Sequence, residues 1–509
     1  MTSPPHHFSY SEYSTHPNSA MDVFGTTITA GGMILDFVGA CAAYSEEAAS
    51  LKARFEWDLH ALKAVQDYFE QRKAQNENQQ LSSEDAALLE RTAGYLDNLV
   101  SKVQRSLHKI QRKGLLNNVV NRGMWITRQA DLKEMEAEVY EWTRRFDVRV
   151  LGLPQKLRAS IPSSVELEPP SIIRSHDRLR HFLDLTSNIK KKQVKMKRLE
   201  NSEQLAAKIT ARGDACFLPM QEGDRQLIFA SRSVSPLIIS APPIFNKLEF
   251  EMGMLAAALS CFDWDTGIRL LRVESYFYHR DLKQFIFIHV SPFPVVSTMN
   301  LEDAIKQDCF PNTEATLHGR FTLALKLAEA VFFLHTAGFV HKNITSSSVV
   351  ALQRLGSAST SLDDCYLMGF DLIRGVDGKT SKEGAVINNN EEGRSIWEFD
   401  IFQHPDRLSG KDSLRYTKTY DVYSLGVVLL EIGSWEPLIE IATGLNENDR
   451  SHWTVELLEA ASILGPKTGG RYQRLVAWCL GVDGSEVVTE GMFVEHVLDP
   501  LEEIVNALS

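Results

Sequence analysis

The pattern of apolar residues changes twice along this 509-residue chain, near residue 216 and near residue 291. From Met21 to about Leu153 apolar residues recur at the three- and four-residue spacing of a helix face, with no convincing alternating strand among them. Beyond residue 216 short β-type runs follow one another as far as Ser291, and the pattern is helical from there to the end. Strands followed by helices indicate a small sheet-rich lobe and a larger helical lobe. We therefore predict an all-α helical bundle followed by a bilobal α+β domain.

The length agrees with more than one folding unit, because 509 residues exceed what a single hydrophobic core holds. A proline-rich stretch, 154–171, separates the two patterns and leads into a basic run between Lys190 and Arg198. We expect this run to be a solvated helix face or hinge, with contact to acidic lipid as the alternative. The predicted divisions are a disordered leader at 1–20, a helical bundle at 21–153, a linker with a helical, basic segment at 154–204, and the α+β domain at 205–509, with a small lobe at about 205–292 and a large lobe at about 293–509.

The composition narrows the function classes. A net charge of -12 gives no reason to expect binding to nucleic acid. The six cysteines lack the C-x-x-C or histidine pairing of a zinc or redox site, which favours reduced thiols, no bound metal and a cytoplasmic location. The apolar stretch from Val23 to Tyr44 approaches membrane-spanning length, but Asp36 and the Gly31-Gly32 pair lie inside it. We therefore expect no permanent transmembrane helix.

The periodicities also place the individual elements. Predicted helices of the bundle are Val23–Tyr44, Tyr44–Lys73, a stretch from Ser82 through Val103, and Gln129–Phe146. Predicted strands are Gln226–Phe229, Leu237–Ile239, Arg269–Phe277 and Phe285–Val290. Predicted large-lobe helices are Leu301–Ile305, Phe321–His335, Asp421–Ile432, Val455–Ile463, Tyr472–Leu480 and Met492–Leu508.

Four large-lobe segments occur in an informative order. They are the helix Phe321–His335 with the loop Phe339–Ser348 and a predicted strand Val349–Leu352, the segment Tyr366–Leu372, His404-Pro405-Asp406, and the helical run Asp421–Glu431. This series resembles the central helix and catalytic loop, the metal-binding segment, the closing Ala-Pro-Glu element and the buried Asp-x-Trp-Ser-x-Gly helix of protein kinases. The resemblance implies a kinase-like fold for the α+β domain.

The residues that transfer phosphate in kinases are replaced in these motifs. A kinase catalytic loop uses an aspartate as base, a lysine at the phosphate and an asparagine on magnesium. At these positions the chain has Asn343, Thr345 and Ser348, and Gly369 stands in place of the metal-binding aspartate. The resemblance therefore implies a degenerate catalytic loop with no catalytic residue.

Two other motif residues match positions that build structure. In kinases the catalytic-loop histidine and the aspartate of the buried helix hold the loop backbone through hydrogen bonds, and His341 and Asp421 match them. We expect this support to persist, because buried polar groups must find partners whether or not the loop is catalytic.

Only weak candidates for phosphate or metal binding remain. The stretch from Ile209 to Leu237 has no G-x-G-x-x-G loop, and the strand expected at Leu237–Ile239 carries no lysine. Lys247 is the nearest lysine, but it falls in the next helix beside Glu249 and Glu251, which we expect to be solvated. Asp371, two residues beyond Gly369, is a weak metal candidate, with a capping or salt-bridge role as the alternative. We expect no cofactor, and ATP with magnesium is the alternative.

A narrower resemblance covers both parts of the chain. The strings His-Lys-Asn-Ile, Gly-Phe-Asp and His-Pro-Asp-Arg look like those of fungal kinase-like proteins that carry an N-terminal HeLo-type, or prion-inhibition-and-propagation, helical domain. The glycine-bearing first helix near Val23–Cys41 and the position of Trp125, ahead of an acidic helix ending in Glu141-Trp142-Thr143, are similar to that domain.

This resemblance implies a pseudokinase signalling protein that regulates its fused helical bundle in fungal programmed cell death or non-self response. Its implied partners are other proteins, further copies of the bundle, and a membrane surface on activation. Thr380, Ser381 and Ser395 lie in the segment equivalent to an activation loop, where phosphorylation biases a two-state switch. The alternatives are a kinase that binds ATP with rearranged residues, and a protein-interaction scaffold.

Overall fold

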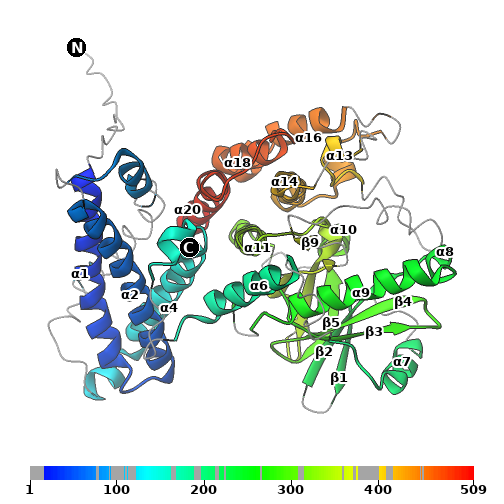
Figure 1. The fold of residues 1–509 in the computed structure, drawn as a ribbon, viewed down its shortest axis with the longest axis horizontal. Coiled ribbons are helices and arrows are strands. Elements are labelled where there is room, and N and C mark those ends of the chain that lie inside the picture. Colours follow the sequence, from blue (N-terminus) through cyan, green and yellow to red (C-terminus); the bar gives the residue numbers. More distant parts are fainter. Residues whose placement is uncertain are drawn as a thin grey trace. The chain divides into compact units, whose positions relative to one another are not determined.

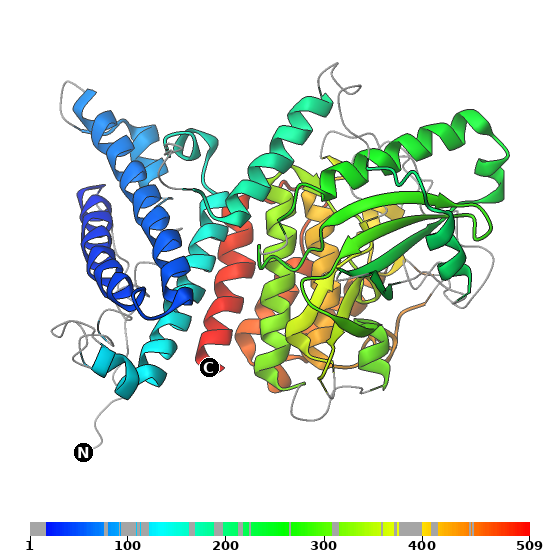
Figure 2. The same cartoon turned by 90° about the horizontal axis from the view of Figure 1, so that it is seen from below.

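The structure, a computed structural model, divides into two compact units, Met1–Pro170 and Ser171–Ser509. Figures 1 and 2 show the elements of each unit from two directions. The residues described are 17–75, 80–90, 92, 108, 112, 122–161, 168–187, 197–211, 217–222, 225–263, 266–307, 315–357, 360–370, 374–375, 400–408, 416–446, 449 and 452–508.

The first unit is built from long helices. They are α1 (Pro17–Cys41), α2 (Glu46–Gln75), α4 (Arg122–Leu151) and the short α5 (Gln155–Arg158), with a further helical stretch at 83–90. α1 begins inside the segment expected to be a leader, with Pro17 at its first turn, where a missing N–H costs nothing. The helix expected near Ser82 starts there, because the Ser82 Oγ accepts a hydrogen bond from the Asp85 N–H at 3.1 Å.

Apolar side chains at helical spacing form the core of this first unit. The most buried include Phe24, Ile34 and Phe37 of α1, Phe55, Leu62 and Phe69 of α2, and Leu132, Val139 and Phe146 of α4. The segment Phe24–Cys41 is the one described helix long and apolar enough to cross a membrane by length and composition, and 44% of it is buried inside the structure. The segment thus has one buried face and one face that is not buried.

A polar cluster lies buried between α2 and α4. Arg54 pairs with Asp147 at 3.1 Å and stacks over the Tyr140 ring at 4.8 Å. Asp58 and Asp147 are both fully buried. Burial raises the pKa of both carboxyls, that of Asp58 well above its usual value and that of Asp147 to about 7. Arg54 favours the charged form of Asp147, the carboxyl with which it pairs, so the shared proton resides mainly on Asp58.

The second unit opens with helices and a four-stranded antiparallel sheet. These elements are α6 (Ser171–Ser187), α7 (Glu203–Thr210), β1 (Leu218–Glu222), β2 (Arg225–Ser233), α8 (Pro236–Ile239), α9 (Pro242–Leu259), β3 (Val273–His279) and β4 (Gln284–Val290), with strand order β1-β2-β4-β3. Side chains alternate across β2, as the pleat requires. Leu227 and Phe229 pack against Leu205 and Ile209 of α7, whereas Ile228 faces the remainder of the unit.

The larger part of this unit is mainly helical. Its elements are β5 (Val295–Asn300), α10 (Leu301–Gln307), α11 (Leu317–Thr336), β6 (Phe339–Val340), β7 (Val349–Arg354), β8 (Cys365–Leu367), β9 (Arg374–Gly375), α13 (Pro405–Leu408), α14 (Lys418–Ser434), α15 (Leu438–Ile441), α16 (Trp453–Ser462), α17 (Gly465–Thr468), α18 (Gly470–Leu480), α19 (Glu490–Phe493) and α20 (Asp499–Leu508). α14 is buried along its whole length, and α20 lies alongside α11 (Figure 2). This part also contains a three-stranded sheet, β5-β7-β8, and a two-stranded sheet, β6-β9.

One strand prediction is wrong. Residues 237–239, expected to be a strand, lie in α8, because Ser235 accepts a hydrogen bond from the Leu237 N–H and Pro236 occupies the first helical turn. The strand was predicted from the β-branched residues Ile238 and Ile239. The β propensity of two residues is weaker than the combined effect of a helix cap and a proline in the first helical turn. The strand that precedes α9 is therefore β2.

The segment expected to be a linker also contains structure. α6 and residues 197–199 pack on the second unit, whose first residue is Ser171. Lys197 accepts the Tyr276 N–H and Leu199 donates to the Tyr276 carbonyl, both at 2.8 Å. Lys190, Lys191, Lys192 and Lys195 of the basic run lie outside the described residues.

Candidate functional site

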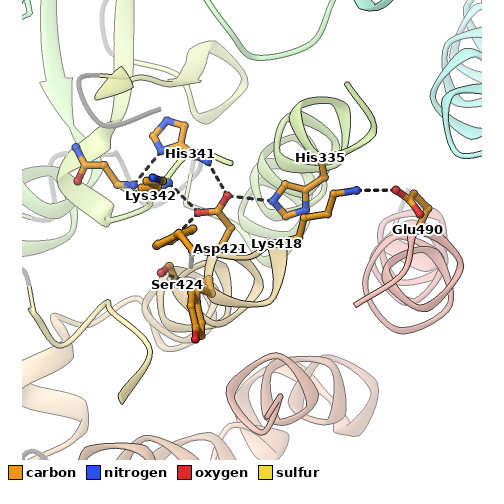
Figure 3. Close-up of polar contacts among 10 residues, drawn as sticks. His335, His341, Lys342, Lys418, Asp421, Ser424 and Glu490 are labelled. Atoms are coloured by element: carbon orange, nitrogen blue, oxygen red, sulfur yellow. Dashed lines mark hydrogen bonds and ion pairs between the residues drawn. The ribbon is translucent and has the colours of Figure 1, made fainter. Parts of the chain in front are cut away.

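The backbone of the loop between β6 and β7, residues 341–348, is held by the carboxylate of Asp421. Asp421, on α14, accepts the backbone N–H of His341 at 2.6 Å and that of Lys342 at 2.8 Å (Figure 3). Its oxygens also accept from His335 Nε2 at 3.0 Å and from the Tyr416 hydroxyl at 2.8 Å. Four donors converge on a fully buried group, so its desolvation is offset by charge-assisted hydrogen bonds.

The protonation states follow from this geometry. Burial acts to raise the pKa of Asp421, but the bond to His335 and the neighbouring imidazoles outweigh it and hold the pKa below its usual value. Burial lowers the pKa of His341 to about 4. His341 is thus a neutral ring at pH 7, and its Nδ1 accepts the Asn343 N–H at 3.3 Å.

Tyr416 provides a further contact to the loop. Lys342 has a left-handed backbone, φ 69°, and its ammonium lies 5.2 Å from the centre of the Tyr416 ring. Arg407 lies 5.4 Å from the same ring. Tyr416 therefore connects the loop, α13 and α14, a role that the sequence analysis did not foresee.

Asn343 does not occupy an open catalytic position. Its amide Nδ2 donates to the carbonyl of Gly369 at 3.1 Å, which ties the loop to the segment after β8. Gly369 has φ +76°, and a Cβ built on it would lie 2.9 Å from Asn343 Nδ2 and 3.0 Å from the Ser348 Cβ. An aspartate at residue 369 would meet both side chains and a backbone region unfavourable to it. A metal-binding carboxylate at this position would therefore require Asn343 and Ser348 to shift and a strained backbone to be tolerated.

Thr345 and Ser348 form hydrogen bonds with each other's backbone N–H groups. The Thr345 Oγ1 accepts the Ser348 N–H at 3.1 Å, and the Ser348 Oγ accepts the Thr345 N–H at 3.0 Å, a reciprocal capping box. Both residues are buried. The two positions that would face phosphate and magnesium therefore stabilise a short 3₁₀ turn, Ser346–Ser348.

On the sheet side, the relevant cation is Arg232. It lies on β2, the strand that leads into α9, and its guanidinium reaches the Sδ of Met252 on α9 at 3.4 Å. Arg232 is only 7% exposed. The sequence analysis missed it because the wrong strand was assigned, although the string Ala230-Ser231-Arg232 at the end of an apolar run was visible. Arginine is a cation of different shape from the lysine that a kinase keeps on the strand before this helix.

The weaker candidates lie apart from this position. Lys247 is on α9 and exposed, not on a strand. Glu249 pairs with Arg198 at 3.2 Å, so it is not simply solvated as expected. Glu251 is half-buried and likewise has an interaction. Asp371 lies outside the described residues, as do Thr380, Ser381 and Ser395.

Apolar side chains fill the space between the sheet and β7. In an active kinase, the nucleotide lies between the cation on the strand before this helix and the metal ligands of the large lobe. Members of the cluster in this space are Ile228, Leu271, Val295, Val350, Leu352, Tyr366 and Met368, with Phe217, Ala230 and Phe293 packed against them. Among the described residues, no group of three His, Cys, Asp or Glu side chains is arranged to hold a metal ion.

Comparisons with known proteins agree with a kinase-like second unit. A probable serine/threonine-protein kinase of Dictyostelium discoideum is 24% identical over 154 residues, which make up 30% of this chain and 8% of that protein. The chain thus corresponds to a small part of the relative's length. No family model matches the chain. The similarity supports a kinase-like domain in the C-terminal part.

Proposed function

We propose that the second unit is a pseudokinase, a kinase-like module that signals through its conformation and its contacts with other proteins rather than by phosphoryl transfer. The observation that carries the proposal is the bond from Asn343 to the carbonyl of Gly369. It engages the side chain at the position of the catalytic base, and it ends on the main-chain carbonyl of the glycine that stands at the position of the metal ligand and has no carboxylate to offer. The capping box of Thr345 and Ser348 and the apolar cluster support the same conclusion.

A nucleotide titration tests this proposal. The thermal midpoint of the full-length protein is measured with increasing ATP, with and without magnesium. A ligand present at 100 times its dissociation constant stabilises the folded state by about 2.7 kcal/mol, an effect that is easily measured. We expect no magnesium-dependent shift. A shift that requires magnesium, accompanied by transfer of labelled phosphate, would favour the alternative of an active kinase with rearranged residues.

Arg232 supplies the control for this titration. A buried guanidinium on β2 can attract an anion without any catalytic role. A stabilising effect of ATP that is independent of magnesium and is lost in Arg232→Ala would therefore report anion binding alone. It would leave the pseudokinase proposal intact.

We further propose that this module restrains the helical unit, which acts at a membrane surface in a death or non-self response. The resemblance of α1 and α4 to a HeLo-type domain motivates the idea, and α1 contains the apolar segment Phe24–Cys41. Met33, on α1, is 42% exposed and offers a test. The assay is dye release from anionic vesicles by the full-length protein and by an Asp421→Ala variant whose second unit is loosened.

We expect dye release from the loosened variant and its loss on adding Met33→Glu. The matched control is Val455→Glu, which places the same charge at a 49% exposed apolar residue of the second unit. Release that is equal with either glutamate would show that α1 does not enter the membrane. No release from any variant, with partner proteins still bound, would favour a plain interaction scaffold.

A further inference from the structure

Helix α6 crosses from one part of the second unit to the other. It lies beside α9 and α11 (Figure 1), and its residues Ile172, His176 and Leu179 are buried at the spacing of one helix face. His176 packs edge-on against the Phe333 ring of α11, with 5.8 Å between ring centres. α6 is therefore part of the packed structure and not a solvated connector.

One end of the contact reaches the residues that follow α9. Arg178 forms an ion pair with Asp263 at 2.7 Å, and its Nε donates to the carbonyl of Cys261 at 3.1 Å. Arg174 approaches the same carboxylate at 3.5 Å. The Ser175 Oγ accepts the Asp263 N–H at 2.8 Å. These bonds attach α6 to the sheet-bearing part of the unit through the end of α9.

The other contacts reach the end of α11. A guanidinium nitrogen of Arg180 donates to the carbonyl of Thr336 at 3.4 Å. Gly338 has φ +88°, and a Cβ there would lie 2.9 Å from Leu183 Cδ1. The close approach of Leu183 to this turn requires glycine. α6 therefore contacts both parts of the unit at once.

The chain returns to α9 after α6. Arg198 pairs with Glu249, in the middle of α9, at 3.2 Å. Residues 197 and 199 hydrogen bond to both backbone groups of Tyr276 on β3. Segments before and after the undescribed residues 188–196 thus hold α9 at two points along its length.

We propose that α6 and residues 197–199 form a strap that sets the position of α9 relative to α11, and with it the arrangement of the two lobes. The strap is suited to detach. Arg178 is 48% exposed and Arg174 is 34% exposed, and exposed ion pairs of this kind contribute little stability each. The arginine contacts of the strap can therefore break at little cost while the cores beneath it stay folded. It is a regulatory device whether or not the second unit binds nucleotide.

Hydrogen exchange of the full-length protein tests the strap. Asp263→Ala removes the acceptor of two arginines, and Leu179→Asp releases α6 through its buried face. We expect amides of α6 and of the C-terminal half of α9 to exchange about two- to fivefold faster in Asp263→Ala and at least about tenfold faster in Leu179→Asp, with β7 and α14 unchanged. The matched control is Glu436→Ala, which breaks an exposed ion pair of 2.9 Å with Lys467 elsewhere in the unit and should leave all four elements unchanged.

Three results would overturn the proposal. In the first, α6 exchanges faster but α9 does not, which would show that α6 does not hold α9. In the second, β7 and α14 accelerate together with α9, which would make α6 an ordinary part of the core. In the third, α6 itself is unaffected by Asp263→Ala and by Leu179→Asp, which would show that these contacts do not hold it.

Discussion

Replacing Gly369 tests directly whether the metal position is closed. A side chain here meets two obstacles, a positive φ of +76° and contacts of 2.9 and 3.0 Å with the Asn343 amide and the Ser348 Cβ. Gly356 provides the matched control, because its φ is +89° but a Cβ there meets nothing within 4 Å. The positive φ costs a non-glycine residue about 1 kcal/mol, and overpacking of a buried site adds about 2 kcal/mol. We therefore expect Gly356→Ala to destabilise the unit by about 1 kcal/mol and Gly369→Ala by about 3 kcal/mol.

The assay is amide exchange of the buried strand β7, which exchanges when its unit opens globally. The expected acceleration is roughly fivefold for Gly356→Ala and more than about 100-fold for Gly369→Ala. Gly369→Asp, which restores the metal-binding residue type of a kinase, should be at least as destabilising and should not confer magnesium-dependent binding of ATP. Equal effects of the two alanine variants, or a stable Gly369→Asp protein that binds magnesium, would refute the argument from crowding.

Other predictions concern buried polar groups and the first helix. Asp421→Ala removes the acceptor of four donors and should destabilise the second unit by about 3 to 5 kcal/mol, measured by the same amide exchange; a loss below about 1 kcal/mol would contradict its central position. Burial raises the pKa of Asp58 in the folded state above its value in the unfolded state. The protonated Asp58 therefore adds to the free energy of unfolding in acid, and this stabilisation is lost as the pH rises from the unfolded pKa to the folded pKa. Asp58→Asn should flatten the pH profile of exchange in α2, and an unchanged profile would show that Asp147 holds the proton. Gly32→Ala adds a Cβ that meets nothing within 4 Å and should stabilise α1 by up to about 1 kcal/mol, whereas Gly31→Ala must displace Leu59 and should stabilise it less or not at all, as judged by exchange in α1.

The large-lobe elements could be predicted because local sequence determines them. α11 and α14 are apolar over many turns, and Thr316, at the start of α11, caps it by accepting the Gly319 N–H. His341 and Asp421 are 80 residues apart in sequence, yet motif order alone predicted their meeting. Motif order predicts this contact because the loop N–H groups and the buried Asp421 carboxylate would each lack a hydrogen-bond partner without the other.

The sheet side could not be predicted in the same way. Which strand precedes α9 depends on a cap at Ser235 and a proline, and both outweighed a short β-branched run. The error moved the expected cation position from Arg232 to residues 237–239. The apolar cluster between the sheet and β7 joins residues from five separate segments, so no local window contains it. The docking of α6 likewise depends on Asp263, 85 residues beyond Arg178, which periodicity does not reveal.

The proposed loss of kinase chemistry at this site is stable because the residues that replace the catalytic ones bond to and pack against one another. An asparagine at 343 donates to a carbonyl that glycine presents, a bond that a carboxylate base could not make. The glycine at 369 leaves room for that amide. Ser348 packs beside this glycine and also forms the reciprocal capping box with Thr345. Restoring one catalytic residue breaks a bond, crowds a neighbour or opens a cap before it gains any function. Recovery of activity would therefore require several simultaneous changes, and each single reversion should lower stability without binding nucleotide.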